Sequence, residues 1–169
     1  NNTDTSTGAG GIKASYSNPQ LNFVTITDNV SEGGENVGGI NLHYSNCTMT
    51  NSIIWNNNDL EFYIDDNSSI NATYSDAEGG WEGTGNINAD PLFCNADSSD
   101  FTLYNNSPCI GTGQDGTNMG AYSVGCYSSS SDAPDTLWTN NFGGMNEEKS
   151  ESVQQTADGG FILAGYTNS

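Results

Sequence analysis

Arginine is absent from this 169-residue sequence, and its basic side chains are Lys13, Lys149 and the single histidine, His43. Against them stand 21 Asp and Glu residues, so the formal net charge at pH 7 is -19. Binding to nucleic acid or to an anionic membrane surface depends on lysine and arginine side chains that meet phosphate groups. The scarcity of basic residues therefore argues against both kinds of partner.

Long apolar runs and signal-peptide features are also missing. No stretch approaches the roughly 18 apolar residues that a membrane-spanning helix needs. The first residues, NNTDTSTGAGG, have neither a basic nor an apolar region. We expect a soluble chain without membrane insertion, whose sequence begins within a longer protein or after processing.

The four cysteines, Cys47, Cys94, Cys109 and Cys126, lack the C-x-x-C spacing of a zinc site. In a chain rich in Asn, Ser and Thr they indicate an oxidising, extracellular compartment with up to two disulfides. Three pairings are open to four cysteines. We prefer Cys94 with Cys109, because a separation of 15 residues makes a modest loop to close.

A glycine-led motif occurs twice: GGIKASYSN begins at position 10 and GGINLHYSN at position 38, 28 residues later. The echo continues through SNPQLNFVTITDN and SNCTMTNSIIWNN, which aligns Leu21 with Met49 and Ile26 with Ile54. A third, shortened copy, SSINATYS, places Ile70 at the position of Met49 after 21 residues. Repeats of this length are typical of solenoids, propellers and arrays.

The pattern inside each copy favours an all-β solenoid with almost no helix. Runs of three to five residues alternate apolar and polar, with Gly, Asn, Asp or Ser at the corners, and none has a helical period. A propeller blade would need four longer strands. Asn side chains at matching corners are expected to stack in ladders. The expected inward side chains are Ile12, Ala14, Tyr16, Leu21, Val24, Ile26, Ile40, Leu42, Tyr44, Met49, Ile54 and Ile70.

Four motifs follow one another in order: NSIIWNNN, TYSDAEGGWEGTGNINADPLF, DFTLYNNSPCIGTG and DGTNMGAY. With the repeat before them, over residues 8 to about 122, they closely resemble the C-terminal part of secreted bacterial right-handed parallel β-helix repeat proteins. The resemblance implies a triangular coil of three parallel sheets. It also implies a closed C-terminal end, formed by Trp81, Pro91, Leu92, Phe93, Phe101 and Leu103.

A second resemblance lies downstream of a Ser-rich linker at 127–135. DTLWTNNFGGMNEEKSESVQQTADGGFILAGYTNS is similar to the start of a repeat from secreted bacterial β-propeller-like domains. ADGG between VQQT and FILAGYT is a strong hairpin signal. We therefore expect a parallel β-helix with its closing region over 1–126, the linker, and a strand and hairpin segment of about three strands over 136–169. One such unit leaves edges uncovered. Either the sequence is a fragment of a longer protein, or the hairpin packs on its own β-helix, or it pairs with another subunit by strand addition.

Catalytic motifs are lacking. Asp65 and Asp66 superficially resemble the adjacent aspartates of polygalacturonases, but the Gly-His-Gly and Arg-x-Lys motifs that accompany them are missing, so a solvated turn is the preferred interpretation. His43 stands between Leu42 and Tyr44 and is expected to point outward, with no nucleophile in a recognisable motif. We predict that the protein is not an enzyme.

Ligand sites are weakly indicated. Asp97, Asp100 and Asp115 are the best candidates to bind calcium, although neither the EF-hand nor the calcium β-roll spacing is present, so no cofactor is assigned. The aromatic side chains of Tyr63, Trp55 or Tyr127 would suit stacking on sugars.

The functional hypothesis is a non-catalytic extracellular structural protein of the bacterial cell surface. It would act as a stalk, an adhesin or a self-assembling filament subunit, joined through its β-helix ends and its C-terminal hairpin into a homo-oligomer or polymer. The alternative is a carbohydrate-binding or polysaccharide-degrading β-helix module, with surface glycans as partners. Neither hypothesis requires a metal or a cofactor.

Overall fold

The structure, a computed structural model, describes residues 2–5, 9–32, 37–58, 60–128, 148–155 and 161–167. The chain divides into two compact units, 1–128 and 129–169. The described part is all-β, with two short 3₁₀ turns, η1 (Ala96–Ser98) and η2 (Gln114–Gly116). No helix among the described residues is long and apolar enough to cross a membrane.

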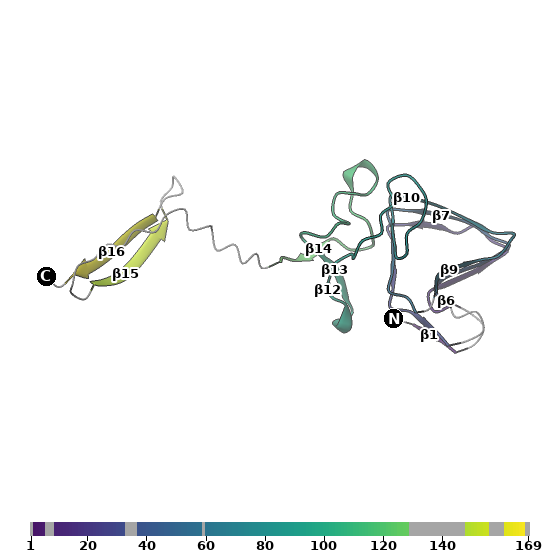
Figure 1. The fold of residues 1–169 in the computed structure, drawn as a ribbon, viewed down its shortest axis with the longest axis horizontal. Coiled ribbons are helices and arrows are strands. Elements are labelled where there is room, and N and C mark those ends of the chain that lie inside the picture. The colour runs from purple at the N-terminus through teal and green to yellow at the C-terminus, as the bar shows by residue number, and fades with distance from the viewer. Residues whose placement is uncertain are drawn as a thin grey trace. The chain divides into compact units, whose positions relative to one another are not determined.

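Three parallel sheets form the three sides of a triangle in the first unit (Figure 1). Their strands are β2 (Ile12–Ser15), β6 (Val37–His43) and β9 (Leu60–Ile64) in the first sheet; β3 (Gln20–Asn22), β7 (Asn46–Thr50) and β10 (Ser69–Thr73) in the second; and β4 (Thr25–Thr27), β8 (Ile53–Trp55) and β11 (Asp76–Ala77) in the third. The chain passes once through each sheet and then repeats the circuit. We call β2, β3 and β4 layer 1, β6, β7 and β8 layer 2, and β9, β10 and β11 layer 3.

The register between layers 1 and 2 follows the sequence repeat. Ile12 pairs with Ile40 in the first sheet, Leu21 with Met49 in the second, and Thr27 with Trp55 in the third. The alignment made from the two glycine-led motifs is therefore confirmed.

The register of layer 3 corrects the sequence alignment. Ile70 pairs with Cys47, and it is Ala72 that lies beside Met49. Apolar character alone could not choose between Ile70 and Ala72, because both side chains pack in the same core.

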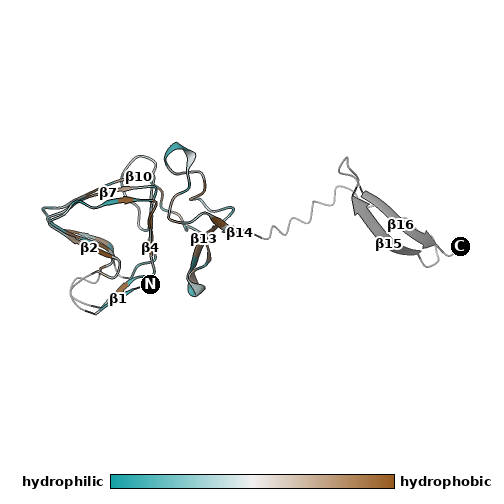
Figure 2. Cartoon of the chain, turned by 180° about the vertical axis from the view of Figure 1, so that it is seen from behind, coloured by the Kyte–Doolittle hydropathy of each residue, from teal (hydrophilic) through white to brown (hydrophobic). Residues whose placement is uncertain are grey.

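The core between the sheets consists of buried apolar side chains from all three layers, and brown, apolar positions are visible in the sheet that contains β4 (Figure 2). Its buried members are Ala14, Ile26, Ile40, Leu42, Cys47, Met49, Ile54 and Ala72, with Ile12, Leu21, Val24, Phe62, Ile64, Ile70 and Trp81 packed against them. Most of the expected inward side chains are confirmed by this set.

Tyr16 and Tyr44 were expected to point inward, and that expectation is wrong. Their side chains are 79% and 53% exposed. Each residue has a left-handed backbone, with φ of 51° and 47°, which turns the corner and directs the ring out of the sheet. The two rings nevertheless stack, with centroids 5.0 Å apart and planes 8° from parallel.

Side chains at the corners bond one layer to the next. Asn29 donates its backbone N–H and its side-chain Nδ2–H to Asn57 Oδ1, at 3.1 and 3.0 Å. Asn2 in turn donates its N–H to Asn29 Oδ1 at 2.9 Å. The predicted asparagine ladder is thus confirmed, and it satisfies polar groups that the stack buries.

Two further strands lie next to this ladder. β1 (Thr3–Asp4) pairs in parallel with β5 (Val30–Ser31), Thr3 beside Val30 and Asp4 beside Ser31. β5 follows layer 1 in the chain, and β1 lies beside β5 on the side away from layer 2.

The closing region does not form one cap over the last layer. Trp81 packs on Phe62 at layer 3, with ring centroids 4.8 Å apart. Phe93 and Leu103 instead belong to a second cluster, which contains Ile53 from the outer face of the third sheet. Residues 90–126, including β12 (Phe93–Asn95), β13 (Asp100–Tyr104) and β14 (Val124–Cys126), lie outside that sheet, and we call them the covering segment (Figure 1). The expected closure of the C-terminal end therefore holds for Trp81 and is wrong for Phe93 and Leu103.

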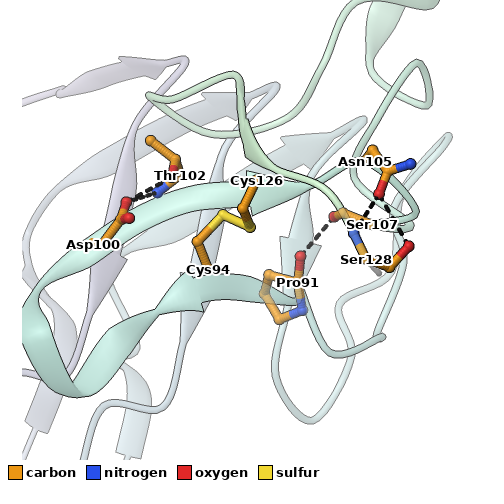
Figure 3. The surroundings of a disulfide bond; sticks show 8 residues. All are labelled: Pro91, Cys94, Asp100, Thr102, Asn105, Ser107, Cys126 and Ser128. Atoms are coloured by element: carbon orange, nitrogen blue, oxygen red, sulfur yellow. Dashed lines mark hydrogen bonds between the residues drawn. A yellow bond between two sulfur atoms is a disulfide. The ribbon is translucent and has the colours of Figure 1, made fainter. Parts of the chain in front are cut away.

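One disulfide joins β12 to β14, between Cys94 and Cys126 (Figure 3). The preferred pairing of Cys94 with Cys109 is therefore wrong. Cys109 is buried as a free thiol against the third sheet, and Cys47 is a free thiol in the core. Loop length was a poor guide here, because β12, β13 and β14 fold into one small sheet that brings together cysteines with a sequence separation of 32.

The second unit contains two antiparallel strands, β15 (Glu148–Gln155) and β16 (Phe161–Thr167), with Gln155 paired to Phe161. The expected linker beyond Ser128, residues 136–147 of the expected strand and hairpin segment, and the ADGG turn lie outside the described residues.

Candidate functional site

A groove of ≈ 240 Å³ runs between the third sheet and the segment that covers it. One wall comes from the corners that follow β4 and β8, and the opposite wall from residues 90–96 and β13. Its lining residues are Thr27, Asp28, Trp55, Asn56, Asp90, Leu92, Phe93, Ala96 and Tyr104. We call it the Trp55 groove.

The first wall is built by the repeat. Because Thr27 pairs with Trp55 in the parallel ladder, their side chains leave the same face of the sheet one layer apart. The next residues, Asp28 and Asn56, both have left-handed backbones, with φ of 56° and 55°. Asn56 Nδ2 donates to Asp28 Oδ1 at 2.6 Å, so the two corners are bonded into one polar rim.

The second wall is held by backbone bonds. Asp90 Oδ1 accepts the N–H of Leu92 at 2.9 Å, and Tyr104 N–H donates to the Leu92 carbonyl at 2.9 Å. Phe93 is braced by an edge-on contact with Phe101, with centroids 5.4 Å apart. The neighbouring Cys94 carries the disulfide to β14, which anchors this wall covalently.

Thr27 is the unusual residue of the groove. It is 6% exposed, and its Oγ1 is a buried polar atom without a hydrogen-bond partner in the part of the chain that the structure describes. Burying a hydroxyl without a partner costs free energy. Thr25, two residues earlier, uses its own Oγ1 to accept the N–H of Ala121 at 3.0 Å.

Two carboxyl groups outside the groove are strongly perturbed. Burial raises the pKa of Asp76 to about 6, against hydrogen bonds from the Ala89 N–H and the Cys109 thiol that lower it. Burial also raises the pKa of Glu61 to about 7; its hydrogen bonds with Asn57 lower it, and the neighbouring Glu78 raises it. Both carboxyl groups therefore change charge near neutral pH.

The free cysteines are not activated. Burial raises the pKa of the Cys47 thiol to about 11. Burial, followed by the charge of Asp76, also raises the pKa of Cys109, whose Sγ donates to Asp76 Oδ2 at 3.2 Å. Since the thiolate is the nucleophilic form, neither cysteine is poised to attack a substrate at neutral pH.

His43 and Asp65 come together, but as part of a turn. His43 Nδ1 lies 3.6 Å from Asp65 Oδ2, and the ring centroids of His43 and Tyr63 are 5.6 Å apart. Asp65 accepts hydrogen bonds from Ser68 Oγ and from backbone N–H groups, and the bond from Ser68 is the main reason its pKa is lowered. Asp66 is exposed in the same turn.

The calcium candidates are not gathered into a site. Asp97 is exposed in η1, Asp115 is exposed in η2, and Asp100 Oδ1 accepts hydrogen bonds from Thr102 (Figure 3). Among the described residues there is no group of three or more His, Cys, Asp or Glu side chains that could hold a metal ion. Of the aromatic residues proposed for stacking, Trp55 lines the groove, and Tyr127 is 76% exposed elsewhere.

Comparisons with known proteins found no matching family model, no matching curated protein and no matching solved structure. The sequence indicated Trp55 as a candidate binding residue but not Thr27, Asp28 or Asn56. The 28-residue repeat could have found them, because it aligns Thr27 with Trp55 and Asp28 with Asn56. Asp90 and Tyr104 gave no signal, because only the packing of the covering segment brings them to the groove.

Proposed function

We propose that this chain is a non-catalytic structural segment of an extracellular protein, in which each layer is one coil of a right-handed parallel β-helix. The order and register of three parallel sheets support the coil assignment. The right hand follows from the general rule for crossovers between parallel strands of one sheet. The disulfide supports an oxidising compartment such as the bacterial cell surface.

The observation that carries the proposal is the difference between the two ends of the stack. At layer 3, Trp81 covers Phe62, Tyr74 N–H donates to the Thr84 carbonyl at 2.8 Å, and Asn86 Nδ2 donates to the Ala72 carbonyl at 3.0 Å. Residues 81–86 thus lie against the second-sheet strand β10 of the last layer, and Ile87 bridges to Asp76 on β11. We expect this covering to oppose further stacking at layer 3.

At layer 1, β2, β3 and β4 are the edge strands of their sheets. Phe23 N–H donates to the Thr50 carbonyl, and the Pro19 carbonyl accepts from Thr48 N–H. Because successive backbone groups of a strand alternate in direction, the N–H groups of Gln20 and Asn22 face the other way, toward the free edge.

The occupant we assign to this edge is a preceding coil in the same register. β1 supports it: Val30 N–H donates to the Asn2 carbonyl at 2.8 Å, so residues 2–4 already continue the stack one step beyond layer 1. Core residues of layer 1, including Ile12, Val24 and Ile26, line a hollow of ≈ 370 Å³ that such a coil would adjoin. The chain would then be the closing portion of a stalk.

The second unit has a separate role in this proposal. β15 and β16 are paired to each other in a two-stranded sheet, and a two-stranded hairpin is marginal alone. Pairing of a free edge with a further strand, as the resemblance to propeller-like repeats implies, would join the stalk to more chain or to another subunit.

A tandem duplication tests the stalk proposal. A second copy of residues 2–28 inserted before Asn2 gives a chain in which Asn2 takes the place of Asn29 and the new strands lie over layer 1. We expect a higher midpoint of urea unfolding and a larger m-value, because stacked repeats add interface free energy and buried surface. Hydrogen exchange that finds the added copy unprotected would refute the assignment.

Association of the unmodified chain is the second readout, measured by sedimentation velocity over a range of concentrations. Leu21→Lys places a charge in the partly exposed end of the core and is expected to abolish any association through layer 1. Asn22→Lys is the matched control, since Asn22 is exposed on the same strand and the change adds the same charge. Equal association of both variants would show that copies meet elsewhere.

A further inference from the structure

We propose that the Trp55 groove binds one ring of a neutral saccharide, a function separate from the stalk. The groove lies on the flank of the stack, formed by the third sheet and the covering segment, and it is independent of the open edge at layer 1. Its volume of ≈ 240 Å³ is small, which suits a single ring better than a larger ligand.

The apolar part of the groove fits the C–H face of a sugar. Trp55, Phe93 and Tyr104 line it, and each is partly rather than fully buried. Aromatic side chains offer large, rigid apolar surfaces, and Tyr and Trp also carry a polar end. The bracing of Phe93 by Phe101 and of its neighbour Cys94 by the disulfide keeps this wall in place before a ligand arrives.

The polar part fits hydroxyl groups. Thr27 Oγ1 can donate and accept, and as a buried atom without a partner among the described residues it gains a hydrogen bond when a ligand hydroxyl reaches it. At the rim, Asp28 and Asp90 present carboxylates, the hydrogen-bond acceptors that sugar hydroxyls require. One hydroxyl and two carboxylates beside aromatic walls suit a polyol better than an apolar ligand.

The negative charge of the groove favours a neutral sugar over an anionic one. The groove carries two aspartates and no lysine or arginine, within a chain of net charge -19. Uronic acids, sulfated sugars and phosphates would meet like charge without a cation to offset it.

The test uses the full chain and saturation-transfer difference NMR. The probes are neutral pyranoses (glucose, galactose, mannose and N-acetylglucosamine), with galacturonic acid as the anionic probe and choline as the cationic probe. We expect transfer to the C–H protons of at least one neutral sugar and none to galacturonic acid. Choline binding without neutral sugar binding, or no binding of any probe, would overturn the proposal.

Two variants locate the site. Trp55→Ala is expected to abolish the transfer, but Trp55 also packs in the second apolar cluster, so its folding must be checked. Thr27→Val keeps the shape and removes the hydroxyl; we expect sugar affinity to fall about three- to tenfold, the effect of one hydrogen bond, without loss of thermal stability.

Thr48→Val is the matched control, since Thr48 is exposed on β7, on another sheet. It should leave sugar affinity unchanged. Unchanged affinity in Thr27→Val would place any sugar binding outside the groove and refute the assignment.

Discussion

Asp76→Asn should make the protein more stable at neutral pH, although it removes a charged partner of two hydrogen bonds. Asp76 is 0% exposed on β11. Its Oδ1 accepts the Ala89 N–H at 3.1 Å and its Oδ2 the Cys109 thiol at 3.2 Å. These contacts do not compensate for the loss of water, and the pKa rises from 3.8 to about 6, with burial as the main cause.

Because the pKa of Asp76 is raised in the folded state, its effect on the free energy of unfolding depends on pH. A carboxyl group whose pKa is higher in the folded state favours folding when it is protonated. That contribution is fully present below the unfolded value of 3.8 and is lost as pH rises through about 6. The difference between the two pKa values corresponds to about 3 kcal/mol at pH 8.

The assay is urea unfolding at several pH values from 4 to 8, followed by tryptophan fluorescence. At pH 4 the wild type and Asp76→Asn should have similar free energies of unfolding, because the amide replaces a protonated acid of the same shape. At pH 8 the variant should be more stable by up to about 3 kcal/mol. Glu61, whose pKa rises to about 7, gives both proteins a further decline in the same direction.

The control is Asp66→Asn, which removes the same charge from an exposed turn. It separates the local effect of burial from the general relief of repulsion in a chain of net charge -19. A constant difference between the wild type and Asp76→Asn across the pH range, or an equal gain in Asp66→Asn, would refute the reasoning.

Four further variants test how the first unit is held together. Replacing Cys94 and Cys126 by alanine opens a bridge of sequence separation 32 and should cost about 3 to 4 kcal/mol in urea unfolding. Asn57→Ala leaves buried ladder partners unpaired and should cost about 2 to 4 kcal/mol; a cost no larger than that of an exposed asparagine substitution would argue against the ladder. Met49→Ala, in the middle layer, should cost about 3 kcal/mol and Leu21→Ala, in the end layer, roughly half as much; equal costs would contradict the layered arrangement.

The register of layers 1 and 2 could be predicted from the sequence, because matching side chains recur at one fixed interval and share one environment. Ile12 beside Ile40 and Leu21 beside Met49 are examples. The same reasoning failed for Tyr16, since alternation along a strand ends where a left-handed corner begins and no residue pattern marked that point.

Only one wall of the Trp55 groove could be predicted from the sequence. The pairing of Thr27 with Trp55 is a consequence of the repeat. The opposite wall depends on where the covering segment docks, and this docking uses single long-range bonds such as Gln114 N–H to Asn51 Oδ1, 63 residues apart. Such contacts leave no periodic trace in the sequence. The disulfide between Cys94 and Cys126 was missed for the same reason.

The covering segment also has a consequence for the dynamics of the stack. Stacked repeats with contacts only between neighbours lose their end layers first. Here the segment bonds to all three layers: Ala121 N–H to Thr25 Oγ1 in layer 1, Gly120 N–H to the Asn51 carbonyl at the corner of layer 2, and the Cys109 thiol to Asp76 in layer 3.

Layer 1 should therefore open unevenly. β4, the strand of that layer in the third sheet, is bonded to the covering segment through Thr25. Among the described strands, β3 pairs only with β7. We expect native-state hydrogen exchange to find the amides of β4 more protected than those of β3, although both strands stand at the edge of the stack. Equal protection would mean that the layer opens as a unit and that the contacts of the covering segment do not stabilise β4. Loss of the difference when Thr25→Val removes the acceptor of the Ala121 N–H would identify the bond responsible.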